Sequence, residues 1–202
     1  MTSDVRIKTL LDAVKHLTEK NIQGDFVECG VWKGGSIMAM IYKLLELNIL
    51  DRKIWAFDTY EGMTEPGDDD IDFQNKTAKE LMDQKIANIL CISAYEETTT
   101  NILNTGYPHN MIQFVKGRVE ETIPRSNVEQ IALLRLDTDW YESTMAELNY
   151  FYPKLVKGGI LIIDDYGHWK GCKKAVDEYF HKINEPIHLD EIDYTGRVFY
   201  KS

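Results

Sequence analysis

Aspartates follow two apolar runs in the second half of the chain. One run is followed by Asp137 and Asp139, and the other by the adjacent pair Asp164 and Asp165. Continuous apolar runs are typical of strands that are buried on both faces. If the two strands are neighbours in a parallel sheet, their carboxyl ends share one crevice, where open α/β sheets bind ligands. Carboxylates gathered there would repel one another, and a hard divalent cation such as Mg²⁺, which prefers oxygen ligands, would relieve that repulsion.

Helix capping is the alternative role for these aspartates. Asp139 precedes a predicted helix that begins near Tyr141, and Asp165 lies in the loop before a predicted helix that begins at Lys170. A single aspartate in such a place is commonly an N-cap. Two pairs at the ends of two neighbouring strands favour the metal instead. The acidic run 68–72 is interpreted as a solvated loop rather than as a second metal site.

One histidine and several aromatic residues flank the acids. His168 is the one histidine in the predicted crevice, which makes it a candidate proton acceptor. Trp140, Tyr141, Tyr166 and Trp169 could form walls for a sugar or ring substrate, or could equally pack in the core.

The elements that must position these residues alternate between strand and helix. This order predicts right-handed crossovers and a mostly parallel sheet. An antiparallel end would fit, by analogy, a seven-stranded methyltransferase-type sheet better than a dinucleotide-binding sheet. Strands are expected at 25–29, 53–58, 111–116, 131–137 and 160–164, with a final hairpin over 187–192 and 197–200. Helices are expected at 5–20, from Ser36 to about Asn48, and at 75–87, 95–103, 141–152 and 170–182.

A glycine-rich turn, residues 30–36, joins the first strand to the second helix. A strand, a glycine turn and a helix in this order commonly bring an adenosine-bearing cofactor against backbone amides. Glycine permits positive φ and close approach of a ligand. The candidate cofactor residues here are Gly30, Gly34, Gly35 and Ser36, and Ser36 is also the expected N-cap of the helix. The alternative is an ordinary strand-to-helix turn with no ligand.

Carboxylates also end the first two strands. Asp58 lies about 20 residues beyond the glycine turn, where an acid accepts hydrogen bonds from ribose hydroxyls. Glu28 ends the first strand, where it would repel a pyrophosphate. It is better placed for a cationic or amino-acid-bearing ligand such as S-adenosylmethionine (SAM). Thr59 and Gly117, after the second and third strands, complete the candidate cofactor-binding set.

Length and composition favour one domain, residues 1–202, with an N-terminal helix in 1–23 and a core in 24–202. The net charge of −10 argues against nucleic acid or an anionic membrane surface as a partner. No apolar stretch approaches the ~20 residues that span a bilayer, and no signal-peptide segment is recognisable. The cysteines, Cys29, Cys91 and Cys172, are widely spaced, so we expect reduced thiols in a cytoplasmic protein.

Four segments together resemble the macrocin O-methyltransferase (TylF-like) family. They are Gly24–Ser36, Phe57–Gly62, Leu136–Thr144 and Gly158–Tyr166. The resemblance implies a class I SAM-dependent methyltransferase (Rossmann-like) fold and SAM- and magnesium-dependent methylation of a sugar hydroxyl on a natural product. It also implies that Asp137, Asp164 and Asp165 hold the metal and that Asp139 matches the acid proposed as general base.

The sequence departs from the family pattern in places that affect the substrate. Thr138 and Trp140 stand where glycine and leucine are expected, and only 24 residues lead up to Gly24, where family members have a longer region around the substrate. A macrolide sugar is therefore not implied, and a sugar in a polysaccharide or another metabolite fits equally well. The oligomeric state is left open, a homo-oligomer included.

In the expected reaction, the metal lowers the hydroxyl pKa and Asp139, or less favourably His168, takes the proton. The remaining catalytic contribution is the positioning of oxygen, methyl and sulfur in line. Three other functions compete with this one: a metal-dependent catechol O-methyltransferase, a nicotinamide-dependent oxidoreductase, which would not explain the aspartate pairs, and a non-catalytic SAM-binding protein.

Overall fold

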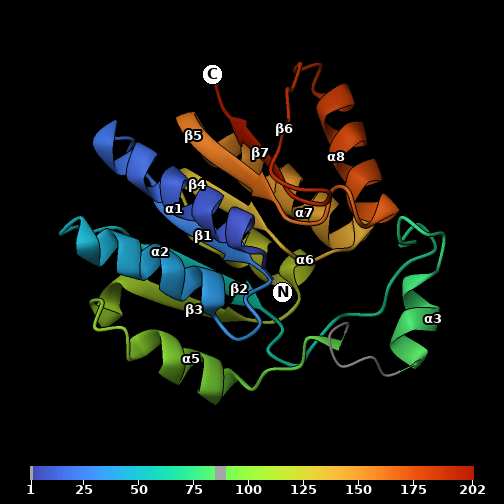
Figure 1. The fold of residues 1–202 in the computed structure, drawn as a ribbon, viewed down its shortest axis with the longest axis horizontal. Helices are drawn as coiled ribbons and strands as arrows, with labels where there is room; N and C mark the ends of the chain where they lie inside the picture. Colours follow the sequence, from blue (N-terminus) through green and yellow to red (C-terminus); the bar gives the residue numbers. More distant parts are fainter. Residues whose placement is uncertain (1, 85–89) are drawn as a thin grey trace.

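A seven-stranded sheet with strand order β3-β2-β1-β4-β5-β7-β6 forms the centre of the protein (Figure 1). The structure is a computed structural model that describes residues 2–84 and 90–202. Strands β1 to β5 are parallel, and β7 pairs antiparallel with both β5 and β6. This architecture confirms the predicted mixed sheet with an antiparallel end. The strands are β1 (Asp25–Cys29), β2 (Ile54–Asp58), β3 (Ile112–Lys116), β4 (Ile131–Leu136), β5 (Leu155–Ile163), β6 (Asp190–Glu191) and β7 (Arg197–Tyr200).

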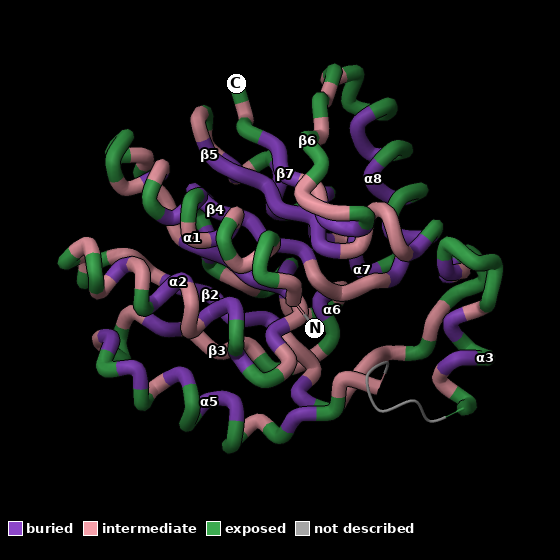
Figure 2. Tube along the Cα trace, in the orientation of Figure 1, coloured by how far each residue is buried: buried purple, intermediate pink, exposed green. Residues whose placement is uncertain are grey.

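Helices cover both faces of the sheet and bury one apolar cluster on each (Figures 1 and 2). Helices α1, α2 and α5 pack on one face, and α6, α7 and α8 on the other. Successive side chains of a strand point to opposite faces. Leu133 of β4 therefore packs in the cluster beneath α1, α2 and α5, and Leu134 packs in the cluster beneath α6, α7 and α8. The helices are α1 (Asp4–Glu19), α2 (Gly35–Glu46), α3 (Ala78–Asp83), α5 (Tyr95–Leu103), α6 (Val119–Thr122), α7 (Tyr141–Phe151) and α8 (Lys170–Lys182). Short 3₁₀ turns are η1 (His109–Met111), η2 (Ile123–Arg125) and η3 (Tyr152–Lys154).

The central strands create the crevice that the aspartates occupy. The chain runs outward from β1 through β2 to β3 and then returns to β4 on the other side of β1. Ligands bind at such a reversal of strand order, outside the carboxyl ends of the strands. Every residue of β4 is buried, as the apolar run predicted, and β4 and β5 are neighbours, with Leu136 paired to Ile163.

Several predicted boundaries were wrong. The last parallel strand begins at Leu155 rather than at Ile160, so the glycines at 158 and 159 lie within it. The first strand of the final hairpin is reduced to Asp190–Glu191. The helix expected over 75–87 is α3, Ala78–Asp83, and residues 85–87 of that prediction lie outside the described residues.

Ser36 does not cap α2. Gly34 is the N-cap, with φ of +83°, and its carbonyl accepts the first helical hydrogen bond from Met38 N at 2.9 Å. Glycine adopts this left-handed conformation without strain. In addition, a Cβ on residue 34 would lie only 2.8 Å from the Ile102 side chain of α5. Ser36 is therefore already inside the helix and buried. Within the described residues, no helix is both long and apolar enough to cross a membrane.

Candidate active site

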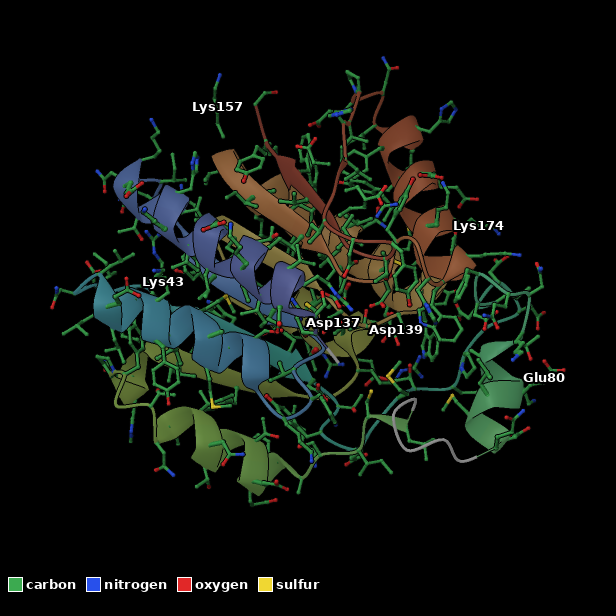
Figure 3. The ribbon with its side chains drawn as sticks, in the orientation of Figure 1. Lys43, Glu80, Asp137, Asp139, Lys157 and Lys174 are labelled. Atoms are coloured by element: carbon green, nitrogen blue, oxygen red, sulfur yellow. The ribbon has the colours of Figure 1, made fainter. Side chains whose placement is uncertain are left out.

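Three carboxylates meet at the carboxyl ends of β4 and β5. Asp137 follows β4, and Asp164 and Asp165 follow β5. The two strand ends are held in register because Asp164 N donates to the carbonyl of Leu136 at 2.9 Å. One oxygen from each of the three aspartates lies within 4.8 Å of the others. The predicted meeting of the two aspartate pairs is thus present in the fold, with Asp137 and Asp139 on the loop beyond β4 (Figure 3).

A buried arginine that the sequence analysis overlooked binds three acids of this site. Arg135 of β4 is paired in the sheet with Glu28 of β1 and contacts its carboxylate at 2.5 Å. The same guanidinium contacts Asp137 and Asp164, each at 2.7 Å. Arg135 is 2% exposed, so these ion pairs are shielded from solvent. Glu28 is also buried, and among the residues that the structure describes its Oε2 has no hydrogen-bond partner.

A second guanidinium reaches the cluster from the N-terminal helix. Arg6 of α1 forms ion pairs with Asp164 and, at 3.0 Å, with Asp193. Each oxygen of Asp164 therefore faces a guanidinium, one from Arg6 and one from Arg135. Burial acts to raise the pKa of Asp164, but the two arginines outweigh it and lower that pKa below its ordinary value.

The pKa values of the other acids of the site are shifted in the opposite direction, upward. Burial, with repulsion from neighbouring carboxylates, raises the pKa of Asp137 and of Asp165 well above the ordinary value, although Arg135 opposes this at Asp137. Burial also raises the pKa of Asp139 to about 7, and a hydrogen bond with Asp165 opposes the shift. Closely spaced carboxylates with raised pKa values are typical of functional sites.

The donor set suits a hard divalent cation. All three clustered aspartates offer oxygen, which is the ligand that Mg²⁺ prefers. Asp165 Oδ2 is buried and has no hydrogen-bond partner in the described structure. A buried, unpartnered carboxylate oxygen is costly unless a ligand satisfies it, so Asp137, Asp164 and Asp165 fit the metal that they were predicted to hold.

Neither Asp139 nor Asp165 caps a helix. Trp140 is the N-cap of α7 and Trp169 that of α8, both without a side-chain cap. The amide of Tyr141 at the start of α7 instead donates to Asp70 Oδ1 at 2.8 Å. Asp70 is buried, and so is Asp72, whose Oδ1 accepts hydrogen bonds from Gln74 N and Lys76 N. The interpretation of the run 68–72 as a solvated loop was therefore wrong at both positions. Among the described residues, the one possible metal cluster is that of Asp137, Asp164 and Asp165.

Asp139 has an unusual backbone conformation. Its φ of +69° lies in the left-handed region, which residues other than glycine seldom adopt. Such conformations cluster at functional sites, where the surrounding structure enforces them. Asp139 lines the larger cavity described below, next to the three clustered aspartates.

Asp58 fixes the backbone of the glycine turn by hydrogen bonds. The carboxylate of Asp58 accepts hydrogen bonds from Val31 N at 2.6 Å, Trp32 N at 2.8 Å and Tyr60 N at 2.7 Å. Gly30 has φ of +83°, and a Cβ there would lie 1.9 Å from the carbonyl oxygen of Asp137. The turn after β1 can therefore pass over the end of β4 only because residue 30 is glycine.

Two adjoining cavities open beside this turn, with Gly30, Asp58 and Asp137 in the walls of both. The smaller, of about 410 Å³, is lined by Thr59 and Gly117 among others. The larger, of about 1100 Å³, contains the three clustered aspartates.

Four of the predicted cofactor residues, Glu28, Gly34, Gly35 and Ser36, line neither cavity, whereas Gly30, Asp58, Thr59 and Gly117 do. The two residues that depart from the family pattern make packing hydrogen bonds. Thr138 donates to Glu147 at 2.8 Å and Trp140 Nε1 donates to the Thr64 carbonyl at 3.0 Å.

His168 lines the larger cavity, and its side chain pairs with Tyr194. Its Nδ1 is 3.0 Å from the hydroxyl of Tyr194, and burial lowers its pKa below the ordinary value. Among the flanking aromatic residues, Trp169 lines this cavity and packs edge-to-face on buried Trp140 at 4.9 Å. Tyr141 and Tyr166 instead donate hydroxyl hydrogen bonds to carboxylates of α8.

Comparison with known proteins places the whole chain in one family. The family described as "Macrocin-O-methyltransferase (TylF)" matches residues 1–202. Demethyldecarbamoylnovobiocin O-methyltransferase of Streptomyces niveus is 34% identical over 95% of this chain and 71% of the relative. A tetracenomycin 4'-O-methyltransferase of Streptomyces olivaceus, which acts on a rhamnosyl substrate by its name, is 33% identical over 97% of this chain and 72% of the relative.

Solved structures agree with this result. The structure of the O-methyltransferase NovP has a TM-score of 0.86 and 31% identity, over 98% of this chain and 80% of that chain. The calicheamicin methyltransferase CalS11 has a TM-score of 0.74 over 98% of this chain and 80% of that one, and at 21% identity it shows the fold alone. The fold is thus that of class I SAM-dependent methyltransferases.

Proposed function

Because this chain belongs to the macrocin O-methyltransferase (TylF) family and is a SAM-dependent O-methyltransferase, we propose that it methylates a sugar hydroxyl of a natural product with the help of Mg²⁺ or a similar cation. The observation that carries the proposal is the cluster of Asp137, Asp164 and Asp165 with Asp139 beside it in one cavity. The sugar acceptor is supported by the printed names of relatives that act on glycosylated metabolites.

The cofactor belongs in the smaller cavity. Gly30 lines this cavity, and because a Cβ there would clash with the Asp137 carbonyl, glycine keeps the turn in this position beside the cavity. Asp58, Thr59 and Gly117 line the same space, at the ends of β2 and β3. We assign Asp58 to the ribose hydroxyls, and SAM supplies the methyl group when it is bound there. Glu28, which lines neither cavity, instead holds Arg135 by an ion pair.

The acceptor belongs in the larger cavity, above the aspartates. Asp137, Asp164 and Asp165 would hold the divalent cation, which would supply Lewis-acid activation of an alcohol when bound. Asp139 is the base that receives the hydroxyl proton on its carboxylate. Arg135 and Arg6 position Asp164, because each holds one of its oxygens. Trp169 lines this cavity and packs on buried Trp140, so this side of the cavity is apolar.

The test is methyl transfer from radiolabelled SAM to a panel of acceptors, with and without a chelator. The panel contains glycosides with free vicinal hydroxyls and, as the alternative, simple catechols. We expect labelled sugar product that disappears in EDTA and returns with magnesium. Turnover of catechols but of no sugar would assign the protein to catechol-type methylation, and full activity in EDTA would remove the metal from the proposal.

A further inference from the structure

A buried aspartate from the loop between β2 and α3 holds the first turn of α7. Asp70 is 1% exposed, and its two carboxylate oxygens accept hydrogen bonds from different segments. Oδ1 accepts from the amide of Tyr141, the first residue of α7, at 2.8 Å, and Oδ2 accepts from the amide of Gly67 in its own loop at 2.7 Å. The first amides of a helix have no partner within the helix, so Asp70 does for α7 what a capping side chain usually does.

Gly171 leaves room for the Asp70 carboxylate between two helices. A Cβ on this second residue of α8 would lie 1.9 Å from Asp70 Oδ1 and 3.2 Å from the amide nitrogen of Tyr141. The hydrogen bond between Asp70 and Tyr141 therefore needs glycine at position 171. Two positions far apart in the sequence, an aspartate and a glycine, are both required for this one contact.

The segment that carries Asp70 is itself fixed. The carbonyl of Asp70 accepts from the amide of Ala78, the first residue of α3, at 2.8 Å. The next carbonyl, that of Ile71, accepts from the amide of Lys170, the first residue of α8, at 2.8 Å. The backbone at Asp70 is thus tied to α3 and α8, and its carboxylate is a firm attachment point for α7.

Asp139 lies between two fixed points of the chain. On one side, the amide of Asp137 donates to the carbonyl of Cys29 at 2.9 Å, and on the other, Tyr141 is held by Asp70. Asp139 has its φ of +69° within this short span. A left-handed conformation at a residue other than glycine persists only where the surrounding structure enforces it. The hydrogen bond from Tyr141 to Asp70 is one of the restraints that do so.

We propose that Asp70 is a positioning residue for Asp139, the proton acceptor of the proposed reaction. Asp70 lines neither cavity, so it acts through the backbone of residues 139–141 rather than on a ligand. Asp139 lines the larger cavity beside Asp165, and a shift of its backbone moves its carboxylate relative to the acceptor hydroxyl. A displacement of about 1 Å in such a group lowers a rate by about 10²-fold. The inference rests on the proposed sugar O-methylation and adds to it a residue outside the cavities.

Variants at position 70 separate positioning from folding. Asp70→Ala removes both acceptor oxygens, whereas Asp70→Asn keeps one for the Tyr141 amide. Thr77→Ala is the matched control, because Thr77 caps α3, rather than α7, through the amide of Glu80. With saturating SAM and magnesium, we expect Asp70→Ala to lower kcat by about 10–100-fold, and Asp70→Asn and Thr77→Ala to lower it by less than about threefold. The affinity for S-adenosylhomocysteine, the demethylated cofactor, should not change in any of them.

A double-mutant cycle tests whether Asp70 acts through Asp139. If it does, Asp70→Ala should cost little more once Asp139→Asn has removed the carboxylate that Asp70 positions, because residues that act as a unit have non-additive effects. Losses of kcat that multiply in the double variant would overturn the inference, and so would an Asp70→Ala enzyme with native kcat.

Hydrogen exchange supplies a readout that needs no acceptor. With S-adenosylhomocysteine bound, Asp70→Ala should speed exchange of the amides of residues 139–144 by about tenfold, as the loss of a helix cap predicts, and Thr77→Ala should leave these amides unchanged. Gly171→Ala keeps Asp70 but displaces its carboxylate, so it should have the same effect and makes the test independent of whether Asp70→Ala folds. Unchanged exchange at residues 139–144 in these variants would overturn the inference whatever the acceptor is. If exchange responds but no glycoside is methylated, Asp70 still positions Asp139 and only the proposed function is refuted.

Discussion

Replacing Arg135 by methionine removes the cation that two buried acids, Glu28 and Asp164, share with the partly exposed Asp137. Glu28 and Asp164 are 1% and 3% exposed, so water cannot take the place of the guanidinium. Removal of one partner of a buried ion pair destabilises a protein by about 3–5 kcal/mol. For a chain of this length each 1 kcal/mol lowers the melting temperature by about 2–4 °C, so a fall of roughly 6–20 °C is expected in thermal unfolding.

The pH dependence of this loss has a definite sign. In the native protein the pKa of Asp164 is lowered, so its contribution to stability is present above the ordinary pKa and is lost as pH falls through the folded value. Without Arg135, burial dominates at Glu28 and Asp137, whose pKa values then lie further above the unfolded ones. The variant is consequently penalised most at high pH, and the difference in free energy of unfolding should be larger at pH 8 than at pH 5.5.

Magnesium should partly restore the stability of the Arg135→Met variant, because the carboxylates no longer have the Arg135 guanidinium as a competing cation. The rise in melting temperature on adding magnesium should exceed that of the native protein, and Arg125→Met, at an exposed arginine, should change neither quantity. An Arg135→Met protein with native stability at pH 8 would refute this account of the ion pairs. A smaller magnesium effect than in the native protein would show that Arg135 does not compete with the cation.

Three further predictions concern the site itself. Asp139→Asn should slow turnover by about 10²–10⁴ while SAM and magnesium still bind, and His168→Ala should cost less; the reverse order in a steady-state assay would transfer the role of base to His168. Removal of divalent cations should abolish turnover. In calorimetry, Asp165→Asn should weaken magnesium binding more than Asp164→Asn does, because both oxygens of Asp164 already face arginines. Equal losses of magnesium affinity would contradict that ranking. Asp58→Ala should weaken SAM binding by roughly ten- to a hundredfold, and unchanged affinity in the same calorimetric titration would remove Asp58 from the cofactor site.

The position of the site could be predicted because its signals are local. An apolar run that ends in aspartate reports both a buried strand and the chemistry at its carboxyl end, and two such runs predicted the meeting of Asp137 with Asp164. The helix boundary at Ser36 could not be predicted in the same way. Which residue caps α2 depends on the space beside Ile102, a residue of a helix far along the chain.

The two arginines illustrate what a local pattern does and does not contain. Arg135 interrupts an otherwise apolar run, and a charged residue in a strand buried on both faces requires acidic partners, so the signal was available. Arg6 has no comparable signal, because it lies on an ordinary amphipathic helix and its partner Asp164 is 158 residues away.

Charge balance explains why arginines and a cation can serve the same cluster. Glu28 and the aspartates at 137, 139, 164 and 165 are five carboxylates, and the guanidiniums of Arg135 and Arg6 can neutralise only two of them. Arg135 is buried and Arg6 lines the larger cavity, and together they hold both oxygens of Asp164. The unpartnered Oδ2 of Asp165 and the side chain of Asp139 remain as the uncompensated part of the cluster. The residual negative charge is therefore concentrated where a cation and an acceptor hydroxyl would have to be held, and among the described residues that line this cavity Arg6 is the one arginine or lysine.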